Sequence, residues 1–329
     1  MAPPPVAESS DVLTAVLVVG PLALVALAYG RRVRRLAATG HPVPGWRQAC
    51  FYSGFAVIAA AVTGLGPLSQ ELLYVHMIEH LLLGEIGALL IVLGLTGSLI
   101  APILTFRVFG VRIFDRLRVL AHPLVAFPLW AIDLYAWHLP ALYQAALRHP
   151  GIHVLQHAMF LGLGINMWMC LFGPLPMPSW FGNLGKLLYI VAVRLTGAVL
   201  GNIFLWSGTV FYSYYLHGDA VYNISPLADQ SIAGAVMMVE ESLLTLGLFC
   251  WLFLRAAKEG EERQELLDYA RLHGIELTDE RAARAVSAGR GAELRRRLET
   301  QVADGRPPAD AEGGVPARSG ASEPAGELH

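Results

Sequence analysis

Two pairs of histidines, each pair separated by four residues, are the strongest candidates for chemistry in this sequence. His76 and His80 form the first pair, and His153 and His157 form the second. Residues four apart on a helix project from the same face, and each pair then spans about 6 Å along its helix axis. Imidazole is a good ligand for Zn, Cu, Fe and Ni. We predict that the two pairs converge on one or two metal ions.

Three further side chains extend this candidate metal site. His138 is a fifth imidazole, and Met77 and Met237 contribute thioethers. An isolated Met more often fills a gap in a core than binds a metal, so the prediction depends mainly on the histidines. A thioether nevertheless selects soft Cu(I), and a His and Met site without Cys favours copper over structural zinc. Carboxylates often orient metal-binding imidazoles, and we assign this supporting role to Glu79, Asp133 and Asp229.

The segment His76-Met77-Ile78-Glu79-His80 also matches the H-x-x-E-H pattern of some zinc proteases. In such enzymes two His and a distant carboxylate hold zinc, and the Glu activates water. Here the motif leads directly into an apolar run, 81–84, and no clear third ligand follows. We therefore expect a non-enzymatic metal site and assign no catalytic residue.

The composition indicates that the elements holding these residues lie in a membrane. Of the 329 residues 55% are apolar and 15% are charged, against about 25% charged in soluble proteins. None of the apolar runs alternates with a period of two, so helices are expected to cross the lipid. The fold class is therefore an all-α polytopic membrane helix bundle of about seven transmembrane helices, and a nucleic-acid partner is not expected. The predicted spans are 11–29, 48–65, 72–98, 119–138, 152–172, 186–208 and 231–254.

The basic residues between these spans predict the orientation. One set of alternate loops carries ten Lys and Arg, and the opposite set carries only Arg148. The N-terminus should then face outward, in a multi-pass protein of the bacterial plasma (inner) membrane. This orientation depends on Lys and Arg alone, yet it places seven of the nine histidines of the membrane region toward the outside. Cys50, Cys170 and Cys250 fall at the inner ends of spans. This placement excludes a thiolate site at the outer face, where the histidines lie.

Three regions follow from this topology. Residues 1–10 form a short outer N-terminus, residues 11–255 form the transmembrane domain, and residues 256–329 form a cytoplasmic tail. In the tail, Thr278-Asp279-Glu280 resembles a helix start, whereas the composition after Asp304 cannot bury a core. We expect the tail to be partly helical and then disordered, and we give His329 no function.

Charged residues within the spans are the second feature that needs an explanation, because such residues are costly and normally paired. Arg194 lies in the sixth predicted span and Glu240 and Glu241 lie in the seventh. We predict a buried ion pair between Arg194 and one of these acids. A proton or ion relay is the alternative role. Glu85, in the third span, is a further intramembrane acid.

Four segments, in order and with consistent spacing, resemble the multi-spanning CtaG family of cytochrome c oxidase assembly factors. The similarity runs from about residue 47 to residue 255. The segments are His76-Met77-Ile78-Glu79-His80-Leu81-Leu82-Leu83, Trp137-His138-Leu139-Pro140-Ala141-Leu142-Tyr143, Ala145-Ala146-Leu147 with His149, His153 and His157, and Asp229-Gln230-Ser231-Ile232-Ala233-Gly234 with Met237-Met238.

This resemblance implies a factor that helps to build haem-copper cytochrome c oxidase, with an oxidase subunit as partner. The family's histidines correspond to the five already singled out, at positions 76, 80, 138, 153 and 157. We expect the chain to hold copper, as Cu(I), at the outer face of the lipid bilayer and to help metallate the subunit. The alternatives are a copper transporter and a membrane cytochrome that binds haem b through His from two helices. The sequence leaves a homo-oligomer open.

Overall fold

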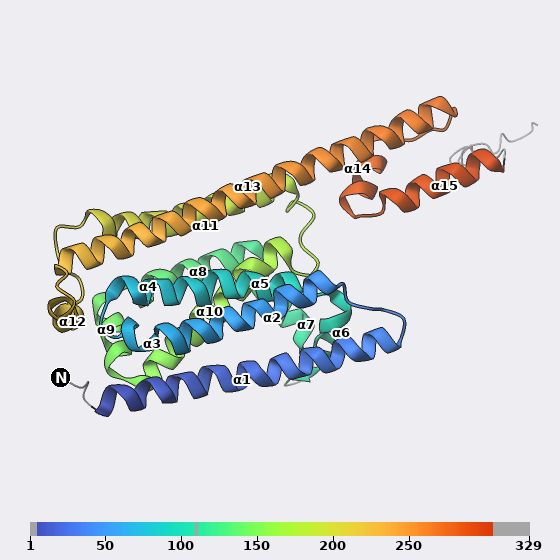
Figure 1. Ribbon diagram of the computed structural model, residues 1–329. Coiled ribbons are helices and arrows are strands. Elements are labelled where there is room, and N and C mark those ends of the chain that lie inside the picture. Colours follow the sequence, from blue (N-terminus) through green and yellow to red (C-terminus); the bar gives the residue numbers. More distant parts are fainter. Residues whose placement is uncertain (1–4, 109–110, 305–329) are drawn as a thin grey trace, which may run out of the picture. The chain divides into compact units, whose positions relative to one another are not determined.

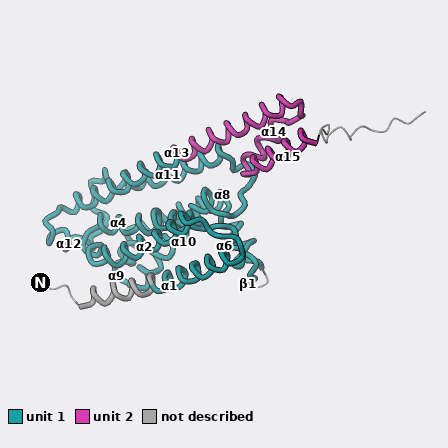
Figure 2. The backbone as a smooth tube through the Cα atoms, turned by 45° about the vertical axis from the view of Figure 1, so that its right-hand side comes forward, with its two compact units in different colours: residues 1–249 teal, residues 250–329 magenta. Residues whose placement is uncertain are grey.

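The computed structural model describes residues 5–108 and 111–304, and nearly all of these residues lie in helices (Figure 1). Residues 1–4 of the predicted N-terminus, and the predicted disordered end of the tail with His329, lie outside the described residues. The chain divides into two compact units, Met1–Phe249 and Cys250–His329, which are coloured separately in Figure 2.

The elements of the first unit are mainly long helices joined by short connections. One two-residue antiparallel ribbon, formed by β1 (Arg107–Val108) and β2 (Val111–Arg112), interrupts them. The helices are α1 (Pro5–Ala38), α2 (Gly45–Ala60), η1 (Ala61–Leu65), α3 (Gly66–Ser69), α4 (Leu73–Leu81), η2 (Leu82–Gly87), α5 (Ala88–Gly94), α6 (Gly97–Thr105), α7 (Ile113–Leu120), α8 (Pro123–Trp137), α9 (Pro140–Arg148), α10 (Pro150–Phe172), α11 (Asn183–Trp206), η3 (Ser213–Tyr215), α12 (Leu216–Val221) and the start of α13 (Pro226–Leu272).

Five helices of the described chain are long and apolar enough to cross a membrane, and a bent pair can supply a sixth crossing. The five are Gly45–Ser69, Leu73–Gly94, Pro150–Phe172, Asn183–Trp206 and the first part of Pro226–Leu272. They coincide with five of the predicted spans. The first predicted span, 11–29, lies along α1, and the side chains of residues 11–19 are outside the described part. The multi-pass helical fold is therefore supported, whereas the count of seven stays a prediction.

The span predicted at 119–138 is not one straight helix. α7 and α8 meet there at a bend of 69°, and His122 between them has an extended backbone with φ −71° and ψ 130°. Pro123 is the reason, because a proline disfavours helical geometry in the residue before it. The same ring suits the first turn of α8, where no backbone N–H is needed.

Glycines let α10 approach the helix that contains the first histidine pair. A Cβ added at Gly164 of α10 would collide with the backbone carbonyl of Gly84. Gly84 lies in η2, a π-helical turn that continues α4, and such turns are often found at functional sites. This close backbone approach brings the segments that carry the two histidine pairs side by side.

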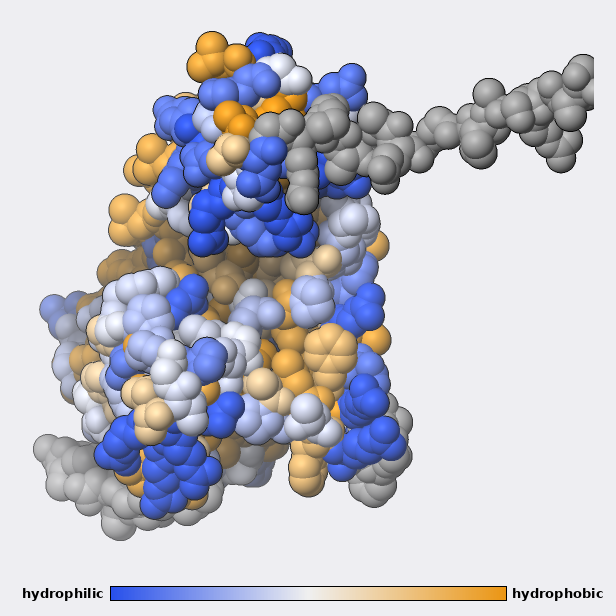
Figure 3. Space-filling model, turned by 90° about the vertical axis from the view of Figure 1, so that its right-hand side faces the viewer, coloured by the Kyte–Doolittle hydropathy of each residue, from blue (hydrophilic) through white to orange (hydrophobic). Residues whose placement is uncertain are grey.

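Polar groups gather at one end of the first unit, away from the histidines. Arg32 donates a hydrogen bond to the carbonyl of Ser98, and Arg47 donates to the carbonyls of Leu93 and Leu95. α6 and α7 lie at this end, whereas the start of α4, α9 and α12 lie at the other (Figure 1). The end face that carries α6 and α7 is rich in hydrophilic residues (Figure 3). The basic loops and the histidines therefore occupy opposite ends of the bundle.

The second unit contains the end of α13, α14 (Asp279–Ser287) and α15 (Gly291–Ala303). α13 continues without a proline past residue 255, the predicted end of the transmembrane domain, and ends at Leu272, so the start of the predicted tail is helical. The Thr278 side chain accepts a hydrogen bond from the backbone N–H of Arg281 and caps α14, as the sequence predicts. Leu266, Val286, Leu294 and Leu298 form a small core of this unit.

Candidate metal centre

Four buried histidines come together near the N-terminal ends of two membrane-length helices. α4 carries His76 and His80, and α10 carries His153 and His157. None of the four is more than 7% exposed. One ligand nitrogen from each ring lies within 4.8 Å of the other three. We call this set the four-histidine cluster.

The spacing within the cluster is close to that of a shared metal ion. The two rings on α4 have centroids 4.3 Å apart, and the two on α10 have centroids 4.2 Å apart. Across the helices, His76 and His153 are 5.4 Å apart, as are His80 and His157. With metal–nitrogen bonds of about 2.0–2.1 Å, two nitrogens on one ion are at most about 4.2 Å apart. Four nitrogens placed tetrahedrally around one ion are only about 3.4 Å apart, so the most widely separated nitrogens of the cluster must approach by up to roughly 1.4 Å for all four to bind it.

Hydrogen bonds set the orientation of the two rings on α4. His76 Nδ1 lies 3.2 Å from the carbonyl oxygen of Ser69. Because a carbonyl only accepts, Nδ1 is the donor, and Nε2 of the neutral ring keeps a lone pair. His80 Nε2 lies 2.9 Å from His76 Nε2, so His80 donates this bond and has its own lone pair at Nδ1. A metal ion bound to His76 Nε2 would replace that hydrogen bond.

Several ring nitrogens of the cluster are buried without a hydrogen-bond partner, and this is the best test of whether a metal fits. These atoms are His80 Nδ1, His153 Nε2, and both Nδ1 and Nε2 of His157. An unpaired buried polar group costs about 1–3 kcal/mol. A cation would satisfy such lone pairs, and neutral imidazoles suit Zn, Cu, Fe and Ni. The residues therefore fit a metal ion.

Glu79 is the predicted supporting residue that lies closest to the cluster. Its Oε1 is 3.8 Å from His157 Nε2, and both side chains are almost fully buried. The carboxylate on α4 thus faces a ring on α10, in a position from which it can orient that imidazole.

The structure places His138, Met77 and Met237 in a neighbouring cavity rather than in the four-histidine cluster. The cavity has a volume of about 50 Å³, and its lining includes these three side chains and His80. The ring centroids of His138 and His80 are 6.5 Å apart. The single predicted set of seven ligands is therefore divided between a cluster of four imidazoles and a cavity lined by His and Met.

Asp229 and Asp133 support the site differently from the predicted way. Asp229 Oδ2 and Oδ1 accept hydrogen bonds from the backbone N–H groups of Leu73 and Tyr74, at 2.7 and 2.9 Å. Asp229 thus caps the start of α4 from another helix, where a negative charge is favoured. Both carboxylate oxygens of Asp133 are buried, and neither has a hydrogen-bond partner, so Asp133 does not orient a histidine through a hydrogen bond.

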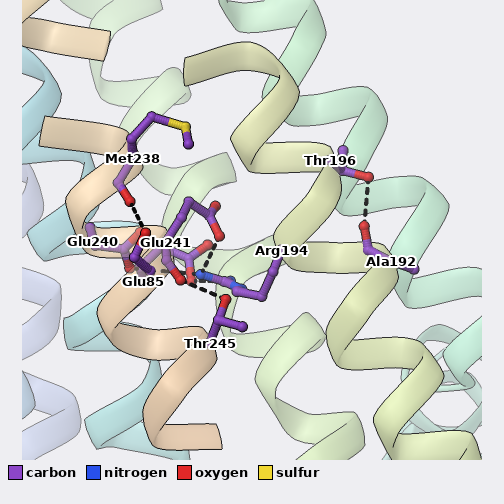
Figure 4. Close-up of polar contacts among 9 residues, drawn as sticks. Glu85, Ala192, Arg194, Thr196, Met238, Glu240, Glu241 and Thr245 are labelled. Atoms are coloured by element: carbon purple, nitrogen blue, oxygen red, sulfur yellow. Dashed lines mark hydrogen bonds and ion pairs between the residues drawn. The ribbon is translucent and has the colours of Figure 1, made fainter. Parts of the chain in front are cut away.

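Arg194 lies deeper, at the centre of three carboxylates (Figure 4). Its guanidinium is 2.8 Å from Glu85 Oε2, 3.1 Å from Glu241 Oε2 and 3.8 Å from Glu240 Oε1. The predicted partners Glu240 and Glu241 are present, but Glu85 on η2 makes the shortest contact. The position of Glu85 midway along the third predicted span is the sequence feature that could have identified it as a partner of Arg194. We call these four side chains the Arg194 cluster.

Three tyrosines beside the histidines, Tyr143, Tyr212 and Tyr215, were not predicted from the sequence. The Tyr143 ring on α9 is 5.3 Å from His76 and 6.1 Å from His138. Its hydroxyl lies 3.2 Å from the Tyr215 hydroxyl, and burial raises the pKa of Tyr143, which keeps the phenol neutral. Tyr212 donates a hydrogen bond of 2.7 Å to the backbone carbonyl of His138. Their spread over residues 143–215 gave little indication that they meet.

Comparisons with known proteins agree with this picture. The family model described as cytochrome c oxidase caa3 assembly factor matches residues 27–259, which confirms the resemblance predicted from the motifs. The chain is 24% identical over 226 residues to a protein of Mycobacterium bovis and to one of Mycobacterium tuberculosis, both described as uncharacterized. Each alignment covers 65% of this chain and 34% of the relative, so the chain spans about a third of those proteins. No solved structure matches the chain.

Proposed function

Because the chain belongs to the cytochrome c oxidase caa3 assembly factor family, we propose that it binds copper at the four-histidine cluster and delivers it to an oxidase subunit. The proposed topology is a seven-span protein of the plasma membrane with its N-terminus outside. The cluster then lies near the outer surface, at the end of the bundle opposite the basic loops. The protein itself is proposed to be non-enzymatic.

The observation that carries this proposal is the convergence of four buried imidazoles, three of which have a ring nitrogen without a hydrogen-bond partner among the described residues. Such a set is costly to maintain unless a ligand fills it. Copper is the metal that a haem-copper oxidase requires and that imidazoles also bind well. Neutral imidazoles in an apolar site add no negative charge, which favours the monovalent ion Cu(I) over divalent ions that need charge compensation.

A haem b cytochrome is less well supported. In a bis-histidine haem the two rings stand on opposite faces of a macrocycle. The rings of the cluster are mutually in contact, with neighbouring centroids at 4.2 to 5.4 Å. The adjoining cavity of about 50 Å³ is also far below the roughly 300 Å³ or more of a site for a drug-sized ligand.

A copper transporter is also less well supported. The ion would have to continue from the cluster through the middle of the bundle, where the buried guanidinium of Arg194 lies among its carboxylates. An ion on this route would have to displace the ion pairs of Arg194 with Glu85 and Glu241, at 2.8 and 3.1 Å, and breaking a buried ion pair is costly. Handover at the membrane surface requires no such passage.

Metal analysis of the purified protein tests the proposal. The full-length chain in detergent is incubated with Cu(I) under reducing conditions, desalted and assayed for copper. We expect His76→Gln/His153→Gln to lose the copper bound at the cluster, and His217→Gln, an exposed histidine of α12, to bind as the native chain does. Equal copper in all three proteins would exclude the cluster as the site. A strain that carries His76→Gln/His153→Gln should contain oxidase with less copper and lower activity than the native strain or a strain that carries His217→Gln.

A further inference from the structure

The cavity beside the four-histidine cluster has a mostly apolar lining that includes four soft or neutral metal donors and two acids. Its donors are His80, His138, Met77 and Met237, and its acids are Glu85 and Glu241. Its volume of about 50 Å³ exceeds the roughly 10–15 Å³ that a single water molecule needs. The cavity is therefore large enough for an ion and too small for an organic cofactor.

His138 is oriented as a ligand for this cavity. Its Nδ1 donates a hydrogen bond of 2.6 Å to the carbonyl oxygen of Leu134. The neutral ring therefore has its lone pair on Nε2, and this atom is buried without a partner in a side chain that is only 8% exposed. A carbonyl that fixes the tautomer of an imidazole through its second nitrogen is a common support for metal ligands.

His80 joins the cavity to the four-histidine cluster. Of the described residues, it alone belongs both to the cluster and to the cavity lining. Its Nε2 faces His76 within the cluster, whereas its Nδ1 is buried without a hydrogen-bond partner. A neutral imidazole has one lone pair, so His80 binds an ion at Nδ1 while Nε2 keeps its proton, or at Nε2 once that proton has moved to Nδ1. The ring therefore serves one site at a time. When both ions are bound, His80 belongs to the cavity and the cluster ion is held by His76, His153 and His157.

The two methionines give the cavity a different preference from the cluster. Met77 and Met237 are 1% and 4% exposed and come from α4 and α13, so the cavity draws its sulfur atoms from two helices. Thioethers are soft donors, and two of them beside imidazoles favour Cu(I). The carboxylates of Glu85 and Glu241 lie 2.8 and 3.1 Å from the Arg194 guanidinium, so the imidazoles and thioethers, and not these acids, are the donors left for an ion.

We propose that this cavity is a second Cu(I) site, with two imidazoles and two thioethers, which exchanges its ion with the four-histidine cluster through His80. This inference rests on the proposed function, because the ion arrives through the cluster. In the exchange, bonds from copper to imidazole nitrogens are replaced by bonds to thioether sulfurs. The ion stays Cu(I), so no electron donor or acceptor is needed.

Counting ions and identifying their ligands tests the second site. The full-length chain in detergent is titrated with Cu(I) against a competing chelator, and the bound ion is examined by X-ray absorption. We expect two ions per native chain and a sulfur contribution to the spectrum. Met77→Leu/Met237→Leu, which preserves side-chain volume, should bind one ion with nitrogen ligands only. Met159→Leu, at an exposed position of α10, should keep two ions and is the matched control.

The reciprocal variant separates this inference from the proposed function. His153→Gln/His157→Gln should lose the nitrogen-only ion and retain one that shows sulfur. A native chain that binds one ion without sulfur would overturn the second site and leave the cluster intact. One ion with both nitrogen and sulfur would mean a single mixed site and would equally overturn it. No bound copper in the native chain would overturn both proposals.

Discussion

Asp229, near the start of α13, accepts a hydrogen bond of 2.7 Å from the backbone N–H of Leu73, the first residue of α4. The two residues are 156 positions apart in the sequence. Leu72, which precedes α4, provides no side-chain cap of its own. The orientation of the helix that carries the first histidine pair therefore depends on a carboxylate from the last membrane-length helix.

Asp229→Ala should destabilise the protein and weaken metal binding together. The substitution removes the acceptor for the N–H groups of Leu73 and Tyr74, and loss of a helix cap costs about 0.5–2 kcal/mol. Thermal unfolding in detergent and copper titration measure the two effects. Asp229→Asn keeps one carbonyl acceptor and should fall between the native chain and the Ala variant. An Ala variant with native melting temperature and native copper affinity would contradict this role.

The sequence predicted the histidine layer well because its signals are local. Spacing of four residues places two side chains on one helix face, and apolar runs of about 20 residues mark the helices. The cap that Asp229 provides could not be predicted from the sequence. It depends on α13 packing beside the N-terminal end of α4, which is a tertiary contact. The separation of His138 from the four-histidine cluster was hidden for the same reason. Depth in the membrane fixes the layer that a residue occupies, but not its position within that layer.

The Arg194 cluster also shows that the sequence predicts how deep a residue lies but not which helices are its neighbours. The cost of burying a charge predicted that Arg194 has an acidic partner. Glu240 and Glu241 were the expected partners because their position along the seventh span matches that of Arg194. Glu85 matches equally well, and only the arrangement of η2 beside α11 shows that it makes the closest contact. Gly197 is part of this arrangement, since an added Cβ there would collide with the Glu241 carboxylate.

Arg194→Gln should be among the most destabilising substitutions in the bundle. Removal of one partner from a buried ion pair leaves uncompensated charge and costs about 3–5 kcal/mol, and here three carboxylates would remain. Glu240→Gln should be much milder, because its carboxylate is 3.8 Å from the guanidinium, against 2.8 Å for Glu85. The amount of folded protein recovered in detergent and its unfolding temperature test this order. A Glu240→Gln variant less stable than Glu85→Gln would contradict it.

Asp219 should make the end of the bundle that carries the four-histidine cluster sensitive to pH. Burial, together with a hydrogen bond to Asp229 and the charge of that carboxylate, raises the pKa of Asp219 from 3.8 to about 7. Protonated Asp219 can donate to Asp229, which caps α4. Because the folded state holds this proton more tightly than the unfolded state, its stabilising contribution is complete below about pH 4 and is lost as the pH rises through about 7.

Thermal unfolding measured from pH 5 to pH 8 tests this effect. Relative to Asp219→Asn, whose side chain does not titrate, the native chain should lose stability as the pH increases through this range. The comparison between the two proteins removes the contribution of other titrating groups. A difference in melting temperature that stays constant with pH would show that Asp219 does not titrate there.

Gly164→Ala should weaken copper binding although residue 164 lies almost two helical turns beyond His157. A Cβ at this position would collide with the backbone carbonyl of Gly84, so α10 must move away from η2. Overpacking of this kind costs about 1–3 kcal/mol. The nitrogens of the four-histidine cluster already need to approach by up to roughly 1.4 Å to share one ion, and a displaced α10 would separate the two pairs further.

Gly162→Ala is the matched control, because it makes the same change on the same helix where no atom lies within 4 Å of the added Cβ. It should bind copper as the native chain does and melt at the same or a slightly higher temperature, since Ala favours helix over Gly. If both variants bind copper with native affinity, the close approach of α10 and η2 does not set the geometry of the cluster. If only Gly164→Ala loses affinity while it remains folded, the distance between the two helices is what holds the histidine pairs within reach of one ion.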